Sequence, residues 1–325
     1  MSNIPASERC PNTLIPIVVL AGPTAVGKTE LSLQIAEELD AEIIGVDSMQ
    51  VYKYMDIGTA KPSPAERGRV PHHLIDYVDP AEEYNVSRFI QDAEEIIEDI
   101  HSRGKTALMT GGTGLYFKSF FEGIFELPEI DKKVRLSLMK RLQADGNESL
   151  YQELKSYDDE SARRIHPNDT SRLIRALEIY LGTGKSRTDF LRVQRKRNGR
   201  PKTTHYVPIK FCLNLDRDQL YARINKRVDI MIDQGLQAEV EKLLDMGYDS
   251  SIQSMQSLGY RHMVEFLQGN WSWEDFRRYL ARDTRRYAKR QLTWFRKDNE
   301  MRWVSPKDAD LIMKVIIKKI PTYKQ

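Results

Sequence analysis

Residues 15–29 read Ile-Pro-Ile-Val-Val-Leu-Ala-Gly-Pro-Thr-Ala-Val-Gly-Lys-Thr, an apolar run that leads directly into a glycine-rich turn. The turn has the spacing G-x-x-x-x-G-K-T and is followed by apolar residues at helical spacing, so it joins a strand to a helix. In such a loop the backbone N–H groups converge on phosphate oxygens, a lysine adds charge, and a threonine can bind Mg²⁺. We therefore predict a phosphate-binding loop made of Gly22, Pro23, Thr24, Ala25, Val26, Gly27, Lys28 and Thr29.

The segments around this loop alternate between strand and helix patterns. Short apolar runs at residues 41–46 and 106–110 predict two further strands, and apolar residues at helical spacing predict a helix over residues 86–100 that Gly104 ends. Such alternation predicts an α/β fold, with a parallel, P-loop NTPase-like sheet flanked by helices. Residues 53–80 contain many glycines and prolines and are expected to be rich in loops.

The pattern changes near Pro128. No strand is evident over residues 131–194, where apolar residues recur at helical spacing. We therefore expect a helical insertion domain that divides a single catalytic core. The predicted boundaries are 1–125 for the first part of the core, 126–202 for the insertion, and 203–325 for the second part, which carries basic C-terminal helices.

The second part of the core is predicted to begin with a strand over residues 207–215. Asp216 is placed to cap a helix over residues 219–234, which Gly235 would end. The chain is then expected to be helical to about Arg296, with a short strand at residues 301–304.

Composition excludes several classes of protein. The 325 residues are 40% apolar and 30% charged, and no apolar run approaches the ~18 residues that a membrane helix needs, so we expect a soluble protein with no membrane partner. The two cysteines, Cys10 and Cys212, exclude a disulfide framework and a cysteine-rich zinc module, and they are typical of the cytoplasm. The 50 basic and 47 acidic side chains give a net charge of only +3, which hides how the charges are distributed.

Asp47 closes the second predicted strand beside the phosphate loop. Enzymes that use nucleotide triphosphates usually hold magnesium with an aspartate at the end of an apolar strand, but the third predicted strand ends in Gly-Gly-Thr. Asp47 lies where α/β proteins bind ligands, and it could bind metal, act as a general base, or cap a turn.

Two other patterns are suggestive but less specific. The turn Gly111-Gly112-Thr113-Gly114 follows a strand, lets the backbone approach a ligand, and offers the Thr113 hydroxyl. Arg223 and Arg227 lie four residues apart on one helix and could close over a diphosphate, or could form ordinary salt bridges with nearby aspartates.

Basic residues are concentrated in two tracts. Residues 192–202 carry six basic residues and no acid, and residues 277–297 carry nine basic residues against Asp283. Charged runs are often only solvated helix faces, but this concentration favours a surface for a polyanion such as a nucleic acid. The basic residues are Arg192, Arg195, Lys196, Arg197, Arg200 and Lys202 in the first tract, and Arg277, Arg278, Arg282, Arg285, Arg286, Lys289, Arg290, Arg296 and Lys297 in the second.

Longer stretches resemble the tRNA dimethylallyltransferase family, also called the tRNA isopentenyltransferases. The most specific stretch is Asp47-Ser48-Met49-Gln50-Val51-Tyr52-Lys53-Tyr54-Met55-Asp56-Ile57-Gly58-Thr59-Ala60-Lys61-Pro62. It is joined by the phosphate loop, by Pro71-His72-His73, by the turn at 111–116, by residues 164–169 and 172–178, by Ser257-Leu258-Gly259-Tyr260-Arg261, and by residues 287–295. The resemblance extends over residues 15–300.

The resemblance implies transfer of a dimethylallyl group from dimethylallyl diphosphate to N6 of adenine 37, beside the anticodon of tRNAs that read codons beginning with U. It implies that Asp47 is the general base, that Thr113 lies near the reacting centre, and that Arg227 joins the phosphate loop in holding the diphosphate. Mg²⁺ is the implied cofactor, with Thr29 as a ligand. A diphosphate leaving group would also explain why the third strand lacks a metal-binding aspartate.

The resemblance further implies a set of residues that contact the tRNA anticodon stem-loop. These residues are Asp47, Ser48, Met49, Gln50, Thr113, Arg135, Ser171, Arg172, Leu173, Ile174, Arg175, Gln256, Ser257, Leu258, Gly259, Tyr260 and Arg261. Ser171 stands where the family commonly has glutamine. The cysteine count excludes the zinc finger of many eukaryotic members, so the shorter bacterial type is expected.

Two alternatives share part of this evidence. A P-loop kinase or NTPase that binds ATP, or a non-catalytic RNA-binding protein, would also need Lys28 and a basic helix. Neither requires Asp47, Thr113 and Arg227 together. A monomeric, cytoplasmic enzyme is expected.

Overall fold

A computed structural model describes residues 14–124, 127–197 and 205–320, with side chains of residues 194–197 not described. The chain forms two compact units, Met1–Phe121 with Thr204–Gln325, and Glu122–Thr203. We call the first the core unit and the second the insertion unit. Their limits fall within a few residues of the boundaries expected from the change of pattern near Pro128.

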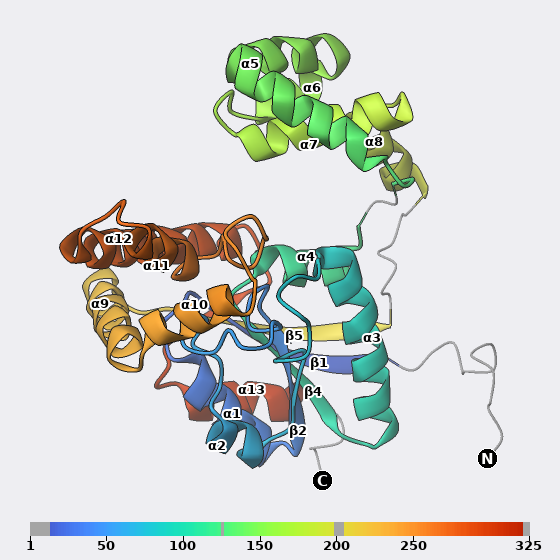
Figure 1. The fold of residues 1–325 in the computed structure, drawn as a ribbon. Helices are drawn as coiled ribbons and strands as arrows, with labels where there is room; N and C mark the ends of the chain where they lie inside the picture. Colours follow the sequence, from blue (N-terminus) through green and yellow to red (C-terminus); the bar gives the residue numbers. More distant parts are fainter. Residues whose placement is uncertain (1–13, 125–126, 198–204, 321–325) are drawn as a thin grey trace, which may run out of the picture. The chain divides into compact units, whose positions relative to one another are not determined.

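The core unit is built on a sheet with the strand order β3-β2-β4-β1-β5-β6 among the described residues, and every pair in it is parallel. The strands are β1 (Ile15–Ala21), β2 (Ala41–Val46), β3 (His72–His73), β4 (Thr106–Gly111), β5 (Tyr206–Leu213) and β6 (Arg302–Val304). Figure 1 shows this sheet with helices around it. The predicted parallel α/β fold is confirmed.

The register of the sheet brings three sequence motifs to one edge. Ala21 on β1 pairs with Gly111 on β4, and Gly111 pairs with Val46 on β2. The residues that follow these three ends are Gly22, Asp47 and Gly112, so the phosphate loop, the acid and the glycine turn begin side by side. This edge is where parallel α/β sheets place their ligands.

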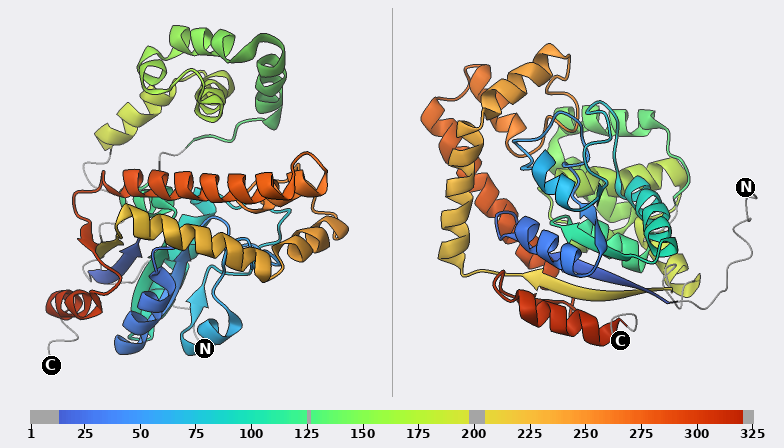
Figure 2. Two further views of the ribbon diagram at one scale, coloured as in Figure 1. Left: turned by 90° about the vertical axis from the view of Figure 1, so that its left-hand side faces the viewer. Right: turned by 90° about the horizontal axis from the view of Figure 1, so that it is seen from below.

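Helices cover the sheet through two apolar clusters. One includes α3 (Val86–Ser102), α4 (Gly114–Glu122), α10 (Leu236–Asp245), α11 (Tyr260–Leu267) and α12 (Trp273–Phe295), and the other includes α1 (Lys28–Glu38) and α13 (Ala309–Lys319). Helix α9 (Arg217–Asp233) contributes to both. Figure 2 shows α9 and α12 running side by side, and their side chains are joined by the hydrogen bond from Arg285 to Asn225.

The predicted helix boundaries follow local signals. Asn85 caps α3 by accepting from the N–H groups of Ser87 and Arg88, and Gly104 follows its end with a positive φ of 75°. Asp216 caps α9 as predicted, and Gly235, with φ 96°, separates it from α10. These residues satisfy backbone groups at helix ends that would otherwise lack partners.

Some elements differ from the predictions. Residues 53–80 include α2 (Pro64–Arg69) as well as β3, and α13 follows a segment for which no element was predicted. Helix α2 is too short for apolar periodicity and is recognisable only from its cap, because Ser63 and Glu66 form a capping box. The strand predicted over residues 207–215 is β5, which ends at Leu213.

The insertion unit is helical and has its own apolar core. Its helices are α5 (Lys132–Tyr157), α6 (Asp159–Arg164), α7 (Thr170–Thr183) and α8 (Arg187–Arg197). The core is formed by residues such as Leu138, Leu150, Leu154, Leu173 and Leu177. The apolar spacing at Leu136 and Met139 marks a helix but not its buried face, because these side chains are 63% and 41% exposed. None of the described helices is long and apolar enough to cross a membrane.

Candidate active site

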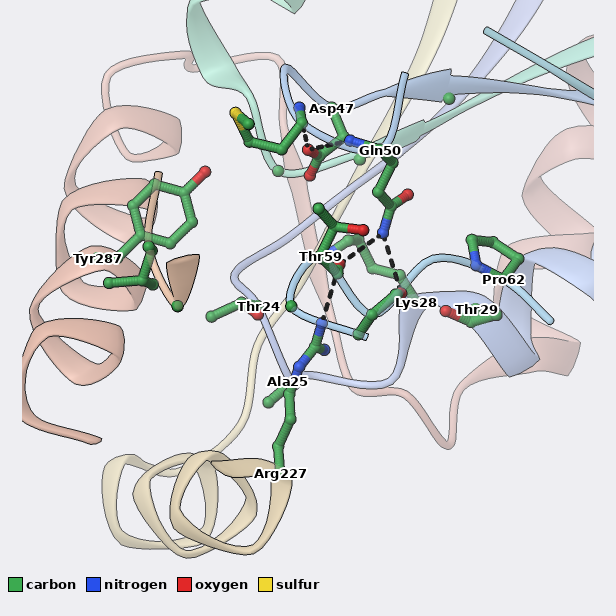
Figure 3. A pocket seen from close by; sticks show the side chains of 18 of the residues that line it. Thr24, Ala25, Lys28, Thr29, Asp47, Gln50, Thr59, Pro62, Arg227 and Tyr287 are labelled. Carbon is green, nitrogen blue, oxygen red and sulfur yellow. Dashed lines mark hydrogen bonds between the residues drawn. The ribbon is translucent and has the colours of Figure 1, made fainter. Parts of the chain in front are cut away.

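A cavity of about 620 Å³ lies at the edge of the sheet where the three motifs meet. Its walls come from the phosphate loop, from the loop that follows β2, from the end of β4, and from α9 and α12. The residues that Figure 3 labels, including Lys28, Asp47, Arg227 and Tyr287, point into this space from different elements.

The phosphate loop keeps its shape through backbone conformation and one folded-back side chain. Gly27 and Ala25 have positive φ values of 107° and 64°. The Lys28 ammonium donates to the carbonyl oxygens of Gly22 and Pro23 at 2.9 and 2.8 Å, so the lysine spans its own loop. Burial, helped by the positive charge of Arg227, lowers the pKa of Lys28 to about 8. A bound anion would relieve this cost, so the cavity favours a negatively charged ligand.

Asp47 uses one carboxylate oxygen to shape the loop and leaves the other toward the cavity. Its Oδ1 accepts from the N–H groups of Met49 and Gln50 at 2.8 and 3.3 Å, and no hydrogen bond from the described residues reaches Oδ2. Burial raises the pKa of Asp47, against the opposing effects of these backbone bonds and of the charges on Lys28 and Arg227. A partly buried carboxylate with a raised pKa and a free oxygen is suited to accept a proton.

Thr113 ties the ends of β2 and β4 together. Its hydroxyl accepts from the N–H of Ser48 at 3.2 Å, and its own N–H donates to the carbonyl of Val46 at 3.2 Å. The first glycine of the turn, Gly111, is needed for this approach, because a Cβ there would lie 2.0 Å from the backbone oxygen of Val46. The Gly-Gly-Thr-Gly turn therefore brings Thr113 beside Asp47.

The two arginines of α9 have different surroundings. The guanidinium of Arg227 lies in the cavity, with Nη2 3.4 Å from the carbonyl of Thr59, and burial lowers its pKa. Arg223 instead donates to the carbonyl of Val26 at 3.0 Å and so supports the phosphate loop from outside. Among the described ion pairs none joins Arg223 or Arg227 to a nearby aspartate, and Asp229 pairs with Arg277.

The loop after β2 is held in place by groups from distant parts of the chain. Gln50 donates to the carbonyls of Thr59 and Ala60, each at 3.1 Å. The Glu239 carboxylate on α10 accepts from the N–H groups of Asp56, Ile57 and Gly58 at 2.8–3.0 Å, and from the Tyr260 hydroxyl at 2.6 Å. This ring of bonds fixes the wall that carries Thr59 and Ala60.

Sequence reasoning missed Gln291 and Tyr287 on α12. Gln291 is buried; its Oε1 accepts from the N–H of Thr24 at 2.9 Å, and its Nε2 donates to the carbonyl of Gly112 at 2.9 Å. It therefore links the phosphate loop to the glycine turn. A signal was present, because Gln291 shares the buried stripe of α12 with Leu280 and Ala288, where a polar residue needs a partner.

The residues expected to contact tRNA fall into both units. In the core unit, Ser48, Met49, Gln50, Ser257, Leu258, Gly259 and Arg261 line the cavity together with Asp47 and Gln256. Tyr260 is fully buried, and its hydroxyl is bonded to Glu239, so a side-chain contact with RNA is excluded at this position.

In the insertion unit, Leu173 and Ile174 are also buried in the apolar core, so any contact of these two residues with RNA would have to come from their backbone. The exposed members are Arg135, Ser171, Arg172 and Arg175, and two of these form ion pairs with Glu178. Of the residues in this unit that were expected to contact tRNA, these four are the ones whose side chains are exposed to a ligand.

The basic residues of α12 are less free than their sequence indicated. Asp283 binds Arg261, Arg282 and Arg286, while Arg277 and Arg278 bind Asp229 and Asp275. In the other basic tract Arg192 pairs with Glu160. The side chains of Arg195, Lys196 and Arg197, and residues Arg200 and Lys202, lie outside the described residues.

The part of the chain that the structure describes has no group of three or more His, Cys, Asp or Glu residues placed to hold a metal ion. Thr29, the expected magnesium ligand, lines the cavity with Lys28. A cation that keeps several waters and is bound mainly by the phosphates of a substrate needs only one or two protein ligands, so the donor set fits magnesium in that form.

Comparison with known proteins gives consistent matches. The family model described as "IPP transferase" matches residues 50–298, and that described as "Isopentenyl transferase" matches residues 15–76. The tRNA dimethylallyltransferase of Desulfotalea psychrophila is 51% identical over 89% of this chain and 90% of its own length. That of Clostridioides difficile is 45% identical over 89% of this chain and 91% of its own length.

Solved structures agree with these matches. A tRNA isopentenylpyrophosphate transferase from Staphylococcus epidermidis superposes with a TM-score of 0.67 at 40% identity, covering 94% of this chain and all of that one. A eukaryotic dimethylallyltransferase, solved acting on tRNA, gives a TM-score of 0.74 at 30% identity, covering 91% of this chain and 75% of that one.

Proposed function

This chain belongs to the tRNA dimethylallyltransferase family, and we propose that it transfers a dimethylallyl group from dimethylallyl diphosphate to N6 of adenine 37 in tRNAs that read codons beginning with U. The observation that carries the proposal is the arrangement around one cavity. A phosphate loop and two partly buried cations, Lys28 and Arg227, occupy one side, and a carboxylate with a raised pKa occupies another. These are the groups needed to remove a diphosphate and to take a proton.

In the proposed reaction the bond from C1 of the allyl group to the diphosphate oxygen breaks, and its electron pair leaves with the diphosphate. The N–H groups of the phosphate loop, with Lys28 and Arg227, stabilise that charge. The lone pair on N6 forms the new bond to C1, and the N6 proton moves to Oδ2 of Asp47. Thr113 holds the loop that presents Asp47 by bonding to the N–H of Ser48.

The adenine must leave its stack to reach this cavity. An exocyclic amine inside a stacked anticodon loop cannot approach a buried allylic carbon, so the base has to turn outward. Gln256, Ser257, Leu258 and Arg261 line the same cavity as Asp47. This part of the wall would contact the flipped adenine and its sugar-phosphate backbone. The exposed arginines of the insertion unit would contact the anticodon stem.

The proposal includes Mg²⁺ as the cofactor. Thr29 would hold it together with the diphosphate oxygens, and the bound ion would neutralise charge on the leaving group. We further propose that the enzyme works as a monomer in the cytoplasm, since one core unit contains every group that lines the cavity.

One assay tests the proposal against its two alternatives. Purified protein is incubated with radiolabelled dimethylallyl diphosphate, MgCl₂ and unmodified tRNA, and the RNA is digested to nucleosides. Label in N6-(dimethylallyl)adenosine from position 37, lost when adenine 37 is replaced by guanine, is expected. ATP hydrolysis without label transfer would instead indicate a P-loop kinase or NTPase, and tRNA binding with neither activity would indicate a non-catalytic RNA-binding protein.

A further inference from the structure

Tyr287 lies on α12 one helical turn before Gln291 and lines the cavity with Asp47, Lys28 and Arg227. Figure 3 shows its side chain extending from α12, with the hydroxyl directed toward the side of the cavity where Asp47 lies. Among the described residues that line the cavity, it is the single Phe, Tyr or Trp ring. It is the first residue of the 287–295 stretch that resembles the family, and the resemblance assigned it no role.

The hydroxyl of Tyr287 lies near the side chains of Thr113 and Gln291, the two residues that join the strand ends. Burial, followed by the nearby charge of Asp47, raises the pKa of Tyr287, so the hydroxyl stays protonated and the ring neutral.

The electrostatics of the cavity favour a group that stabilises positive charge on the allyl side. As the C1–O bond breaks, positive charge develops on the allyl group, while the nearest fixed charges on the diphosphate side, Lys28 and Arg227, are both positive. These two cations stabilise the leaving group and oppose charge on the allyl carbon. An aromatic face beside the allyl group would add to the attraction from the departing diphosphate and from Asp47, because its quadrupole attracts a cation without adding a charge that could be alkylated.

We propose that Tyr287 is a further catalytic residue, whose ring face stabilises the positive charge that develops on the allyl group. This inference rests on the proposed function. It assigns to the ring a contribution made in the transition state and not in the bound substrate, because the charge appears only as the bond breaks.

The test replaces Tyr287 and follows the chemical step in single-turnover transfer to tRNA. Tyr287→Phe keeps the ring and should retain the rate within about threefold, whereas Tyr287→Leu should lower it about tenfold or more, with little change in the Kd for dimethylallyl diphosphate. Thermal melts of each variant check that it is folded.

A series of fluorinated phenylalanines at position 287 separates electrostatics from shape. Each fluorine weakens the quadrupole and barely changes size, so the logarithm of the rate should fall steadily with fluorine number. The same series at Phe266, which packs against Trp273 and is absent from the cavity wall, should leave the rate flat.

The outcomes distinguish the two levels of proposal. A rate that is independent of fluorine number at position 287, in a protein that transfers label normally, would overturn the role of the ring and leave the proposed function intact. Equal rates for Tyr287→Leu and the unchanged protein would do the same. An unchanged protein that transfers no label at all would overturn both.

Discussion

At the scale of single residues, Asp47 shows how one side chain can serve structure and chemistry together. Its position after β2 left open whether it caps a turn or acts on a ligand. The structure shows that Oδ1 forms the turn with Met49 and Gln50, so that Oδ2 is held toward the cavity. The turn itself orients the oxygen that we propose as the base.

Replacing Asp47 by asparagine separates these two uses. Asparagine keeps an oxygen that can accept from Met49 and Gln50 but removes the basic carboxylate. We expect Asp47→Asn to lower the rate of prenyl transfer at least about a thousandfold, while the Kd for tRNA changes less than about threefold. Single-turnover transfer and filter binding measure the two effects. An Asp47→Asn protein with more than a tenth of the normal rate would refute the assignment of the base.

The lowered pKa of Lys28 predicts a pH dependence for ligand binding. In the free protein Lys28 is charged below pH 8 and loses its proton as the pH rises through about 8. Diphosphate binds the protein in which Lys28 is protonated. The affinity for diphosphate should therefore be highest below pH 8 and should decline as the pH rises above 8. Isothermal titration of inorganic diphosphate between pH 6.5 and 9.5 should show this decline.

Lys28→Met provides the control for that titration. It should bind diphosphate weakly at every pH and lose the decline near pH 8, because the titrating group is absent. A decline of the same size in the Lys28→Met protein would assign the pH dependence to another group.

At the scale of elements, the site depends on how closely three strand ends approach one another and α12. The glycine turn after β4 lies against the end of β2, while Gln291 joins that turn to the phosphate loop after β1. The sheet brings the phosphate loop and the glycine turn close together, and helix α12 fixes their relative positions through Gln291. Its buried stripe carries the site, and its exposed face carries the arginines.

The contact between β4 and β2 can be tested with one methyl group. A Cβ at position 111 would lie 2.0 Å from the backbone oxygen of Val46, which cannot move without disturbing the sheet. We expect Gly111→Ala to lower the free energy of unfolding by about 2–3 kcal/mol and to reduce transfer strongly. Urea unfolding followed by circular dichroism measures the first effect.

A matched control comes from helix α2. A Cβ on Gly68 would meet nothing within 4 Å, and the residue has no positive φ. Gly68→Ala should therefore raise the free energy of unfolding by about 0.5–1 kcal/mol, because alanine favours the helix. Equal effects of the two substitutions would show that the close approach at position 111 does not limit stability.

At the scale of the whole molecule, the chain divides the work between two units. Every residue that lines the cavity belongs to the core unit, and the insertion unit has a separate apolar core. The net charge of +3 likewise combines 50 basic and 47 acidic side chains that are unevenly distributed along the chain. Several arginines on α12 form ion pairs with acids such as Asp283, so the positive charge of this surface is partly neutralised.

This division predicts the result of removing the insertion unit. A protein in which residues 122–203 are replaced by a flexible Gly/Ser linker should fold and bind diphosphate with a Kd within about threefold of normal. It should bind tRNA at least about tenfold more weakly, because the exposed arginines Arg135, Arg172 and Arg175 are removed with their phosphate contacts. Unchanged tRNA affinity would place recognition entirely in the core unit.

The sequence by itself was enough to predict the parallel sheet, the phosphate loop, Asp47 and the helical insertion. These features depend on neighbouring residues: a strand is read from a short apolar run, a phosphate loop from eight consecutive residues, and a helix end from a cap such as Asp216. Local patterns carry this information because backbone hydrogen bonding and sterics act over a few residues.

Only the tertiary structure decided which distant side chains complete the site. Gln291 bonds to Thr24 and Gly112, and Glu239 to the backbone of residues 56–58, across separations of 179 to 267 positions. It also decided that Leu173, Ile174 and Tyr260 are buried and cannot offer their side chains to RNA. Packing sets these outcomes, because the face of a helix that becomes buried depends on what lies opposite it, and no short stretch of sequence contains that partner.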